Sequence, residues 1–177
     1  FECWLERRKD LLALTKVHWC YRAAWYAYLA VMILVFHPIE QNEFMVYYQP
    51  KVDLQTGKIV SMEALVRWQH PQRGFVSPAK FIPFAEETGL IEPLGKIVLE
   101  TACREAVGWQ PKTGEPIVMA VNLSAIQFRN PNLVQDVEDV LIRTGLPAHA
   151  LELEITESAV LGDVNATIAK LEELKNL

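Results

Sequence analysis

Three residues with oxygen-bearing side chains, Glu63, Asn122 and Glu154, each lie in an otherwise apolar stretch of the sequence. A carboxylate or carboxamide in such a stretch is costly to bury unless it is paired or binds a metal ion. Oxygen ligands without histidine or cysteine are those that Mg²⁺ and Mn²⁺ prefer. If the three side chains converge, we therefore predict a site for Mg²⁺ or Mn²⁺. Taken singly, each could instead be a polar group at a strand end that faces solvent.

Arg67 lies four residues beyond Glu63, and even spacing on a strand places both on one face. A guanidinium beside a metal site can hold phosphate oxygens in a fork. Two metal ions about 4 Å apart would suit in-line cleavage of a phosphodiester. The alternative for Arg67 is an ordinary surface ion pair.

The elements that must position these residues begin with a predicted hairpin. Phe44–Val52 and Lys58–Trp68 are rich in β-branched and aromatic residues, and a turn-like stretch that ends in Gly57 joins them. This pattern predicts two antiparallel strands. Residues 69–74 are expected to form a loop, and Ser77-Pro78 then predicts the start of a helix that Gly89 ends.

The rest of the chain alternates between helical spacing and apolar runs. Helices are predicted at Ile91–Trp109, Leu133–Leu141 and Asp163–Leu177, and strands at Pro116–Leu123 and Leu151–Ile155. This alternation predicts a parallel sheet in an α/β fold, in which ligands bind at the carboxyl ends of the strands. We expect Glu63, Asn122 and Glu154 at or near such strand ends.

Size and composition favour a single domain in the cytoplasm. A chain of 177 residues can bury a real core. The net charge of −5 argues against a general DNA or RNA binder, which usually carries a basic face. Cys3, Cys20 and Cys103 lack metal-binding spacing and suggest reduced thiols rather than a disulfide framework.

Residues 1–41 differ from residues 42–177, because they are hydrophobic, rich in tryptophan and suggestive of a helix. The apolar run from Ala23 to Phe36 is shorter than the roughly 20 residues that cross a membrane. Extended to residues 17–36 it reaches that length, and it could place the protein at the inner face of the cell membrane. There are two alternatives to a membrane segment: a helix that packs on the protein or binds a partner, and a stretch that is not native to the protein. Residues 1–41 are therefore left unassigned.

Against a membrane span stand the basic residues on the N-terminal side of this run, Arg7, Arg8, Lys9 and Lys16. The positive-inside rule would keep that side in the cytoplasm and place residues 42–177 outside the cell. No small-residue cleavage site follows Phe36, so a secretory signal also fits poorly.

The segment from Glu63 to Trp68, with the sequence EALVRW, resembles the signature of EAL domains, bacterial phosphodiesterases that hydrolyse cyclic di-GMP, a second messenger in signal transduction. Further motifs resemble the same family in order: Tyr48-Gln49-Pro50-Lys51, His70-Pro71, Gly74, Pro78, Phe81-Ile82-Pro83, Ala85-Glu86, Gly89, Ala102-Cys103, Val121-Asn122-Leu123-Ser124, Gln127-Phe128 and Leu153-Glu154-Ile155-Thr156-Glu157. The resemblance runs from Glu43 to Leu177, so residues 42–177 are taken as the EAL domain.

This resemblance implies a TIM-like barrel of the EAL type with one antiparallel strand, and cyclic di-GMP as the ligand. The site residues that it implies are Glu63, Asn122 and Glu154 as ligands of two Mg²⁺ or Mn²⁺ ions, Arg67 on a substrate phosphate, Gln49 and Leu65 lining the substrate site, and Glu157 anchoring an active-site loop. The catalytic residues among them are Glu63, Glu154 and Glu157. The product would be linear pGpG, and a homodimer is possible.

Family members continue with a strand that carries an Asp-Asp pair, then a Lys and a further Glu. The sequence of 177 residues does not contain this stretch. We therefore expect the N-terminal half to two thirds of the barrel, and no turnover by this chain alone, although the complete parent protein would be a hydrolase. The alternative is a non-catalytic EAL module that binds cyclic di-GMP or a protein partner.

Overall fold

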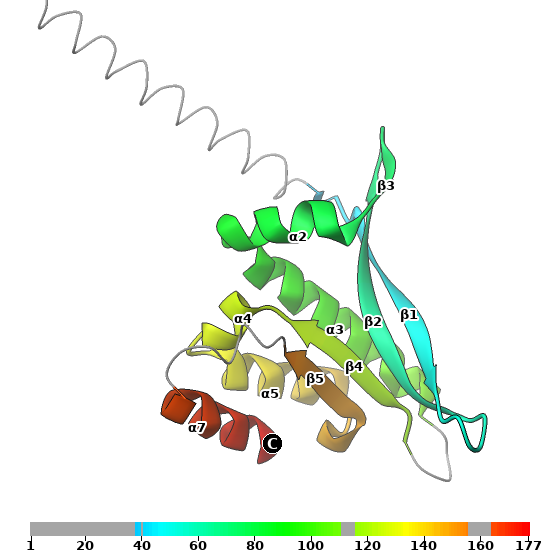
Figure 1. Ribbon diagram of the computed structural model, residues 1–177, viewed down its shortest axis with the longest axis vertical. Coiled ribbons are helices and arrows are strands. Elements are labelled where there is room, and N and C mark those ends of the chain that lie inside the picture. Colours follow the sequence, from blue (N-terminus) through cyan, green and yellow to red (C-terminus); the bar gives the residue numbers. More distant parts are fainter. Residues whose placement is uncertain (1–37, 40, 111–115, 156–163) are drawn as a thin grey trace, which may run out of the picture. The chain divides into compact units, whose positions relative to one another are not determined.

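The computed structural model describes residues 38–39, 41–110, 116–155 and 164–177. Its contacts divide the chain into Phe1–Gln41 and Asn42–Leu177, and the second unit holds the sheet and its helices (Figure 1). The hypotheses on residues 1–37, including the helix of residues 17–36, and on Glu157 lie outside the described residues. Within the described residues, no helix is long and apolar enough to cross a membrane.

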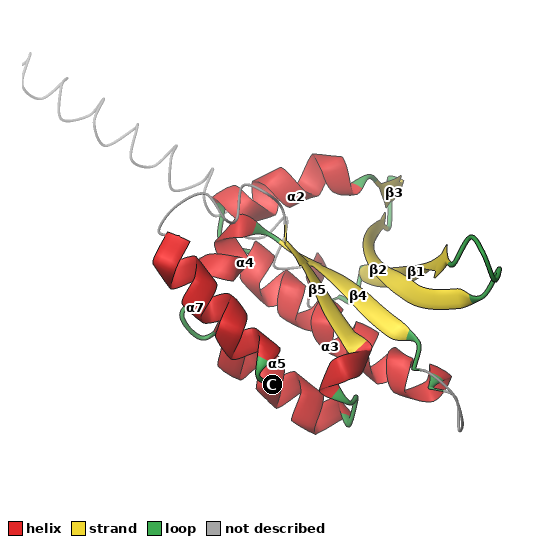
Figure 2. Ribbon diagram, turned by 60° about the horizontal axis from the view of Figure 1, so that its bottom comes forward, coloured by secondary structure: helices red, strands yellow, loops and turns green. Residues whose placement is uncertain are grey.

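Strands and helices alternate along the second unit, as the sequence predicts. The elements are β1 (Phe44–Val52), β2 (Ile59–His70), β3 (Gly74–Val76), α2 (Pro78–Glu87), α3 (Ile91–Trp109), β4 (Val118–Leu123), α4 (Ala125–Arg129), α5 (Leu133–Thr144), a short 3₁₀ helix η1 (Ala148–Ala150), β5 (Leu151–Ile155) and α7 (Val164–Lys175). Figure 2 shows the sheet with α3 and α5 lying along it.

The sheet has the strand order β1-β2-β4-β5, with the short β3 paired to β2. β1 runs antiparallel to β2, whereas β2, β4 and β5 are parallel to one another. The predicted hairpin is confirmed, and its turn is closed by Asp53 Oδ1, which accepts hydrogen bonds from the backbone of Gln55 and Thr56. Gly57 ends the turn with a φ of 68°, a conformation that glycine adopts without strain.

The two faces of the sheet differ because side chains alternate along each strand. Ala64, Met119, Val121 and Leu123 point to the face that α3 covers, and all are buried. α3 contributes Leu94, Val98 and Ala102 to the same core. We call the opposite face the site face. The strand register places Gln49, Lys51, Glu63, Leu65, Arg67, Asn122 and Glu154 on it.

One local prediction was wrong, and one short helix was missed. Residues 69–74 are not simply a loop, because β2 continues to His70 and β3 pairs back onto it, with Trp68 opposite Val76. The reversal is tight enough to need Gly74 at a φ of 67°. The five-residue helix α4 was not predicted, although Ser124 and Gln127 form a capping box that marks its start.

Candidate metal and phosphate site

Glu63 and Asn122 meet on the site face although they lie on different strands. Asn122 Nδ2 donates a hydrogen bond of 2.8 Å to Glu63 Oε1. The expectation that Glu63 lies near a strand end was wrong, because it lies inside the long strand β2, opposite Ala120. Glu63 is level with the middle of β4, two residues before Asn122, and β2 continues well past the end of β4.

Glu154 lies directly beside Asn122 in the parallel register of β4 and β5. Its Oε1 also forms an ion pair with Lys51 Nζ. Lys51 is on β1, so this contact crosses the site face over β2 and β4. The hydrogen bond to Glu154 is the main cause that raises the pKa of Lys51, and the charges of Glu154, Glu63 and Glu152 add to it. The ammonium group therefore lies in a locally acidic environment.

The donor set suits a hard divalent cation in its chemistry. Glu63 and Glu154 provide carboxylate oxygens and Asn122 provides an amide oxygen, the ligand types typical of Mg²⁺ and Mn²⁺. To ligate an ion shared with Glu63, Asn122 would have to turn its amide oxygen toward the carboxylate in place of the nitrogen. Among the residues that the structure describes, no three His, Cys, Asp or Glu side chains form a metal-binding group. The described candidate ligands are thus two carboxylates and one amide.

Gln49, the predicted substrate-lining residue of β1, lies opposite Glu63 in the antiparallel pair. Leu65 follows on the same face and lines a cavity of about 250 Å³. This cavity is also lined by Arg67, Asn122, Ile82 of α2, Gly95 of α3 and Gln127. Much of its lining, including the buried Ala64, Leu94, Val98 and Leu123, belongs to the core between the sheet and α3, so the cavity lies largely on the helix side of the sheet and reaches Arg67 and Asn122 only at its border.

Arg67 lies at the far end of the site face from Lys51. Its Nη1 donates to the carbonyl of Val66 over 2.9 Å, and its guanidinium carbon lies 6.0 Å from the ring centroid of Tyr47. Nothing in the described part of the chain pairs Arg67 with a carboxylate, so the surface ion pair considered above is not found there. The guanidinium keeps donors that an anionic ligand could use.

Lys51, Tyr47 and Phe75 also belong to the surroundings of the site, although no role for them was predicted from the sequence. Lys51 and Tyr47 each lie two residues from Gln49, which on a strand means the same face. That alternation was a usable signal for both. Phe75 carried no such signal, because β3 itself was not predicted.

Comparison with known proteins agrees with this arrangement. The family model described as "EAL domain" matches residues 35–177. This chain belongs to the EAL domain family. The predicted fold class is confirmed as well: the sheet and its helices form part of the TIM-like barrel of EAL domains.

Individual relatives give the same result. The uncharacterized protein y4lL of Sinorhizobium fredii is 50% identical over 141 residues, which are 80% of this chain and 17% of that protein. The bifunctional diguanylate cyclase/cyclic di-GMP phosphodiesterase MucR of Pseudomonas aeruginosa is 42% identical over 136 residues, 77% of this chain and 20% of that protein. The EAL chain thus spans about a fifth of the length of these relatives.

A solved structure of the PaMucR phosphodiesterase in complex with c-di-GMP superimposes with a TM-score of 0.78 at 39% identity. The alignment covers 83% of this chain and 60% of that chain. The chain is accordingly a partial EAL domain.

Proposed function

We propose that this EAL chain provides the first part of a cyclic di-GMP phosphodiesterase site, which in the complete parent protein hydrolyses cyclic di-GMP to linear pGpG. The observation that carries the proposal is the contact of Glu63 with Asn122, with Glu154 next in register on the same face. These oxygens share one sheet face with Gln49 beside Glu63 and with Arg67 four residues farther along β2, which suits an anionic phosphodiester held near cations. Its relative MucR is named a cyclic di-GMP phosphodiesterase.

Phosphodiesterases of this family depend on metal ions, and we propose Mg²⁺ or Mn²⁺ because the candidate ligands are all hard oxygens. Bound metal would activate a water and stabilise the leaving oxygen. In the proposal, Glu63, Asn122 and Glu154 hold the metal. Arg67 holds a substrate phosphate, Gln49 and Leu65 line the substrate site, and Glu157 anchors an active-site loop.

The ligand proposal is tested by Mn²⁺ binding, measured by electron paramagnetic resonance of free Mn²⁺. Glu63→Gln and Glu154→Gln should each weaken Mn²⁺ binding about tenfold or more, since each removes a carboxylate charge. Glu138→Gln is the matched control, because Glu138 lies on α5 and its described contact is a hydrogen bond from Gln135. Equal Mn²⁺ affinity in all four proteins would refute the ligand assignment.

A binding module is the second candidate for the 177-residue chain, because two carboxylates and an amide are few ligands for two ions. Cyclic di-GMP binding is measured by calorimetry, and pGpG formation by chromatography after incubation with Mg²⁺. Binding without pGpG supports the module for this chain and leaves hydrolysis to the complete domain. Robust pGpG formation would contradict the expectation that this chain alone is inactive.

Placement in the cell and assembly are part of the same proposal. We propose a cytoplasmic protein, with membrane association through residues 17–36 and a homodimer as further possibilities for the parent. Carbonate extraction of cell membranes tests the membrane association, since release of the protein into the soluble fraction rules out a spanning helix. Light scattering on the purified chain tests the homodimer.

A further inference from the structure

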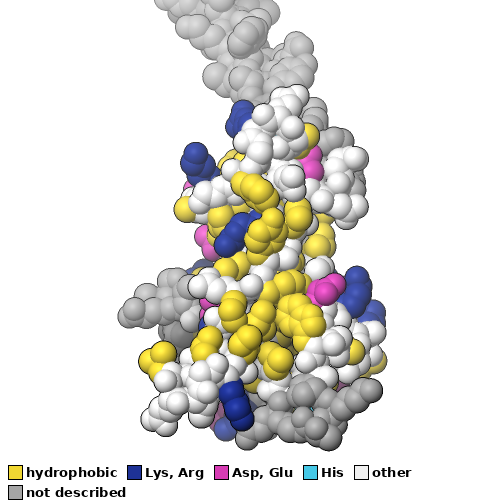
Figure 3. Space-filling model, turned by 90° about the vertical axis from the view of Figure 1, so that its right-hand side faces the viewer, with side chains coloured by type: hydrophobic (Ala, Val, Ile, Leu, Met, Phe, Trp, Pro, Cys, Tyr) yellow, Lys and Arg dark blue, Asp and Glu magenta, His cyan; other side chains and the backbone are white. Residues whose placement is uncertain are grey.

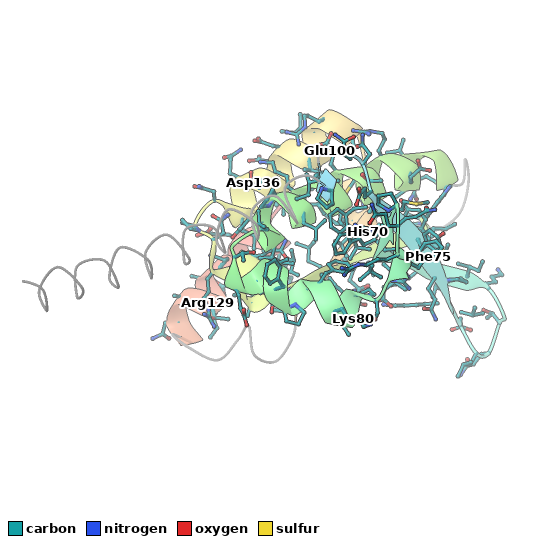
Figure 4. The ribbon with its side chains drawn as sticks, turned by 90° about the horizontal axis from the view of Figure 1, so that it is seen from above. His70, Phe75, Lys80, Glu100, Arg129 and Asp136 are labelled. Atoms are coloured by element: carbon teal, nitrogen blue, oxygen red, sulfur yellow. The ribbon has the colours of Figure 1, made fainter. Side chains whose placement is uncertain are left out.

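Two exposed aromatic rings lie beside Arg67 at the β3 end of the site face. Tyr47 of β1 and Phe75 of β3 stand edge to face, with ring centroids 6.0 Å apart and an interplanar angle of 75°. Tyr47 is 43% exposed and Phe75 60% exposed, although both are large and apolar. Figure 4 shows Phe75 on the sheet side of the molecule, away from Glu100 and Asp136 on the helices.

The strand register places this pair on the same face as the candidate metal ligands. Tyr47 lies opposite Leu65 and Phe75 lies opposite Gln69, so both share the face of Glu63 and Arg67. Four residues of strand separate Glu63 from Arg67, a distance of about 13 Å. Tyr47 is only two strand residues, about 7 Å, from the level of Glu63, whereas Phe75 lies beyond Arg67. The pair therefore extends from the candidate metal ligands toward β3, where the outer part of a larger ligand would lie.

The space beside the pair is an open hollow. It is lined by Tyr47, Arg67, Phe75, Val76, Ser77 and Pro78. Figure 3 shows hydrophobic side chains gathered over this side of the molecule, with basic side chains among them. An aromatic ring wall next to a guanidinium is the arrangement that binds a nucleobase with its phosphate, because a base stacks on a ring while a cation holds the anion.

We infer that Tyr47 and Phe75 form an aromatic shelf that takes one purine base of the dinucleotide, with Arg67 on the adjoining phosphate. This inference rests on the proposed function, since it names how the same site recognises its ligand. The metal ligands and Arg67 recognise only phosphate, so they would bind a nucleotide and a sugar phosphate without a base equally well. The shelf therefore adds specificity for a ligand that carries a base.

The test is calorimetric binding of cyclic di-GMP to the full 177-residue chain and its variants. Phe75→Leu and Tyr47→Leu should each weaken binding at least about fivefold, the lower range for the loss of base–aromatic stacking. Phe75→Tyr keeps a ring and should bind within about twofold of the original chain. Val60→Ala, a change at an exposed apolar residue of β2 outside the shelf, is the matched control and should leave binding unchanged.

A second measurement separates base recognition from general damage to the site. The original chain should bind GMP more tightly than ribose 5-phosphate, and Phe75→Leu should remove most of that preference while Mn²⁺ binding stays unchanged. If the original chain binds cyclic di-GMP and both leucine variants bind it equally well, the shelf is refuted and the proposed function stands. If the original chain binds no cyclic di-GMP, the proposed function fails for this chain and the shelf fails with it.

Discussion

The ammonium group of Lys51 contacts the carboxylate of Glu154 across two intervening strands of the sheet. Flat neighbouring strands lie about 4.8 Å apart, so β1 and β5 of a flat four-stranded sheet would be about 14 Å apart. The sheet must therefore curve toward the site face for these two side chains to meet. The contact places side chains from the first and last described strands together over the candidate site.

Lys51→Met is predicted to strengthen Mn²⁺ binding. The ammonium occupies an oxygen of Glu154 that the proposed metal needs, and methionine keeps much of the side-chain length without the charge. The pair is partly exposed, so we expect a gain of only about two- to fivefold. Electron paramagnetic resonance of free Mn²⁺ measures it.

Lys80→Met on the exposed surface of α2 is the control for the Lys51 variant, since it removes the same charge elsewhere. Weaker Mn²⁺ binding by Lys51→Met would show the opposite role, in which Lys51 orients Glu154 for the metal.

Gly95→Ala is predicted to destabilise the fold by about 1–2 kcal/mol, against the ordinary preference of helices for alanine. A Cβ atom at this position of α3 would lie 1.8 Å from Gln127 Nε2. Gln127 is buried and its Oε1 accepts from the backbone of Ser124, so moving it breaks the capping box of α4. Urea denaturation measures the free energy of unfolding.

Gly108→Ala provides the matched control in the same helix. No atom lies within 4 Å of the Cβ that the substitution adds, so only helix propensity acts. We expect a gain of up to about 1 kcal/mol. If both alanine variants are stabilised, Gln127 relaxes away from Gly95 without cost.

Tyr48→Phe is predicted to leave stability unchanged or to raise it by up to about 1 kcal/mol. The ring packs edge-on against Trp109 at 4.7 Å, whereas the hydroxyl is buried without a hydrogen-bond partner among the described residues. Burial, with the charge of Glu105 and of Cys103, raises the pKa of this hydroxyl to about 12. Removing the hydroxyl keeps the packing and ends the desolvation cost.

The free energy of unfolding in urea tests the Tyr48 variant, with Tyr47→Phe on the exposed face as control. A loss well above about 1 kcal/mol in Tyr48→Phe would mean that the hydroxyl has a hydrogen-bond partner in solution.

Cys103 is predicted to resist alkylation in the native protein. Burial, with a smaller contribution from Glu100, raises the pKa of its thiol to about 12, so at pH 8.5 the reactive thiolate is scarce. Mass spectrometry of the Cys103 peptide after iodoacetamide should show modification in urea and little in buffer. Because the thiol pKa is higher in the folded protein than in the unfolded chain, the protonated thiol favours the folded state. This contribution to the free energy of unfolding is fully present below about pH 9 and decreases as the pH rises toward 12. Rapid labelling of the native protein would show that α3 opens locally.

Much of the fold could be predicted because local patterns and tertiary packing agree. The helix at Ile91–Trp109 and the strand at Leu151–Ile155 were predicted with the bounds that the structure has. β3 was missed because three residues are too short for a periodic pattern, and because its pairing with β2 is a tertiary contact that places Val76 opposite Trp68. α4 was missed for the same reason of length, although its capping box could be read.

The sequence by itself determined the family, the order of the elements, and which residues on one strand share a face, such as Glu63 with Arg67. These follow from motif content and from periodicities of two and 3.6 residues, which are local properties. Only the tertiary structure decided that Asn122 reaches Glu63 and that Lys51 reaches Glu154, because each contact joins different strands. The physical reason is that strand order, register and sheet curvature arise from packing between distant segments, and no local pattern in the chain encodes the distance across a curved sheet.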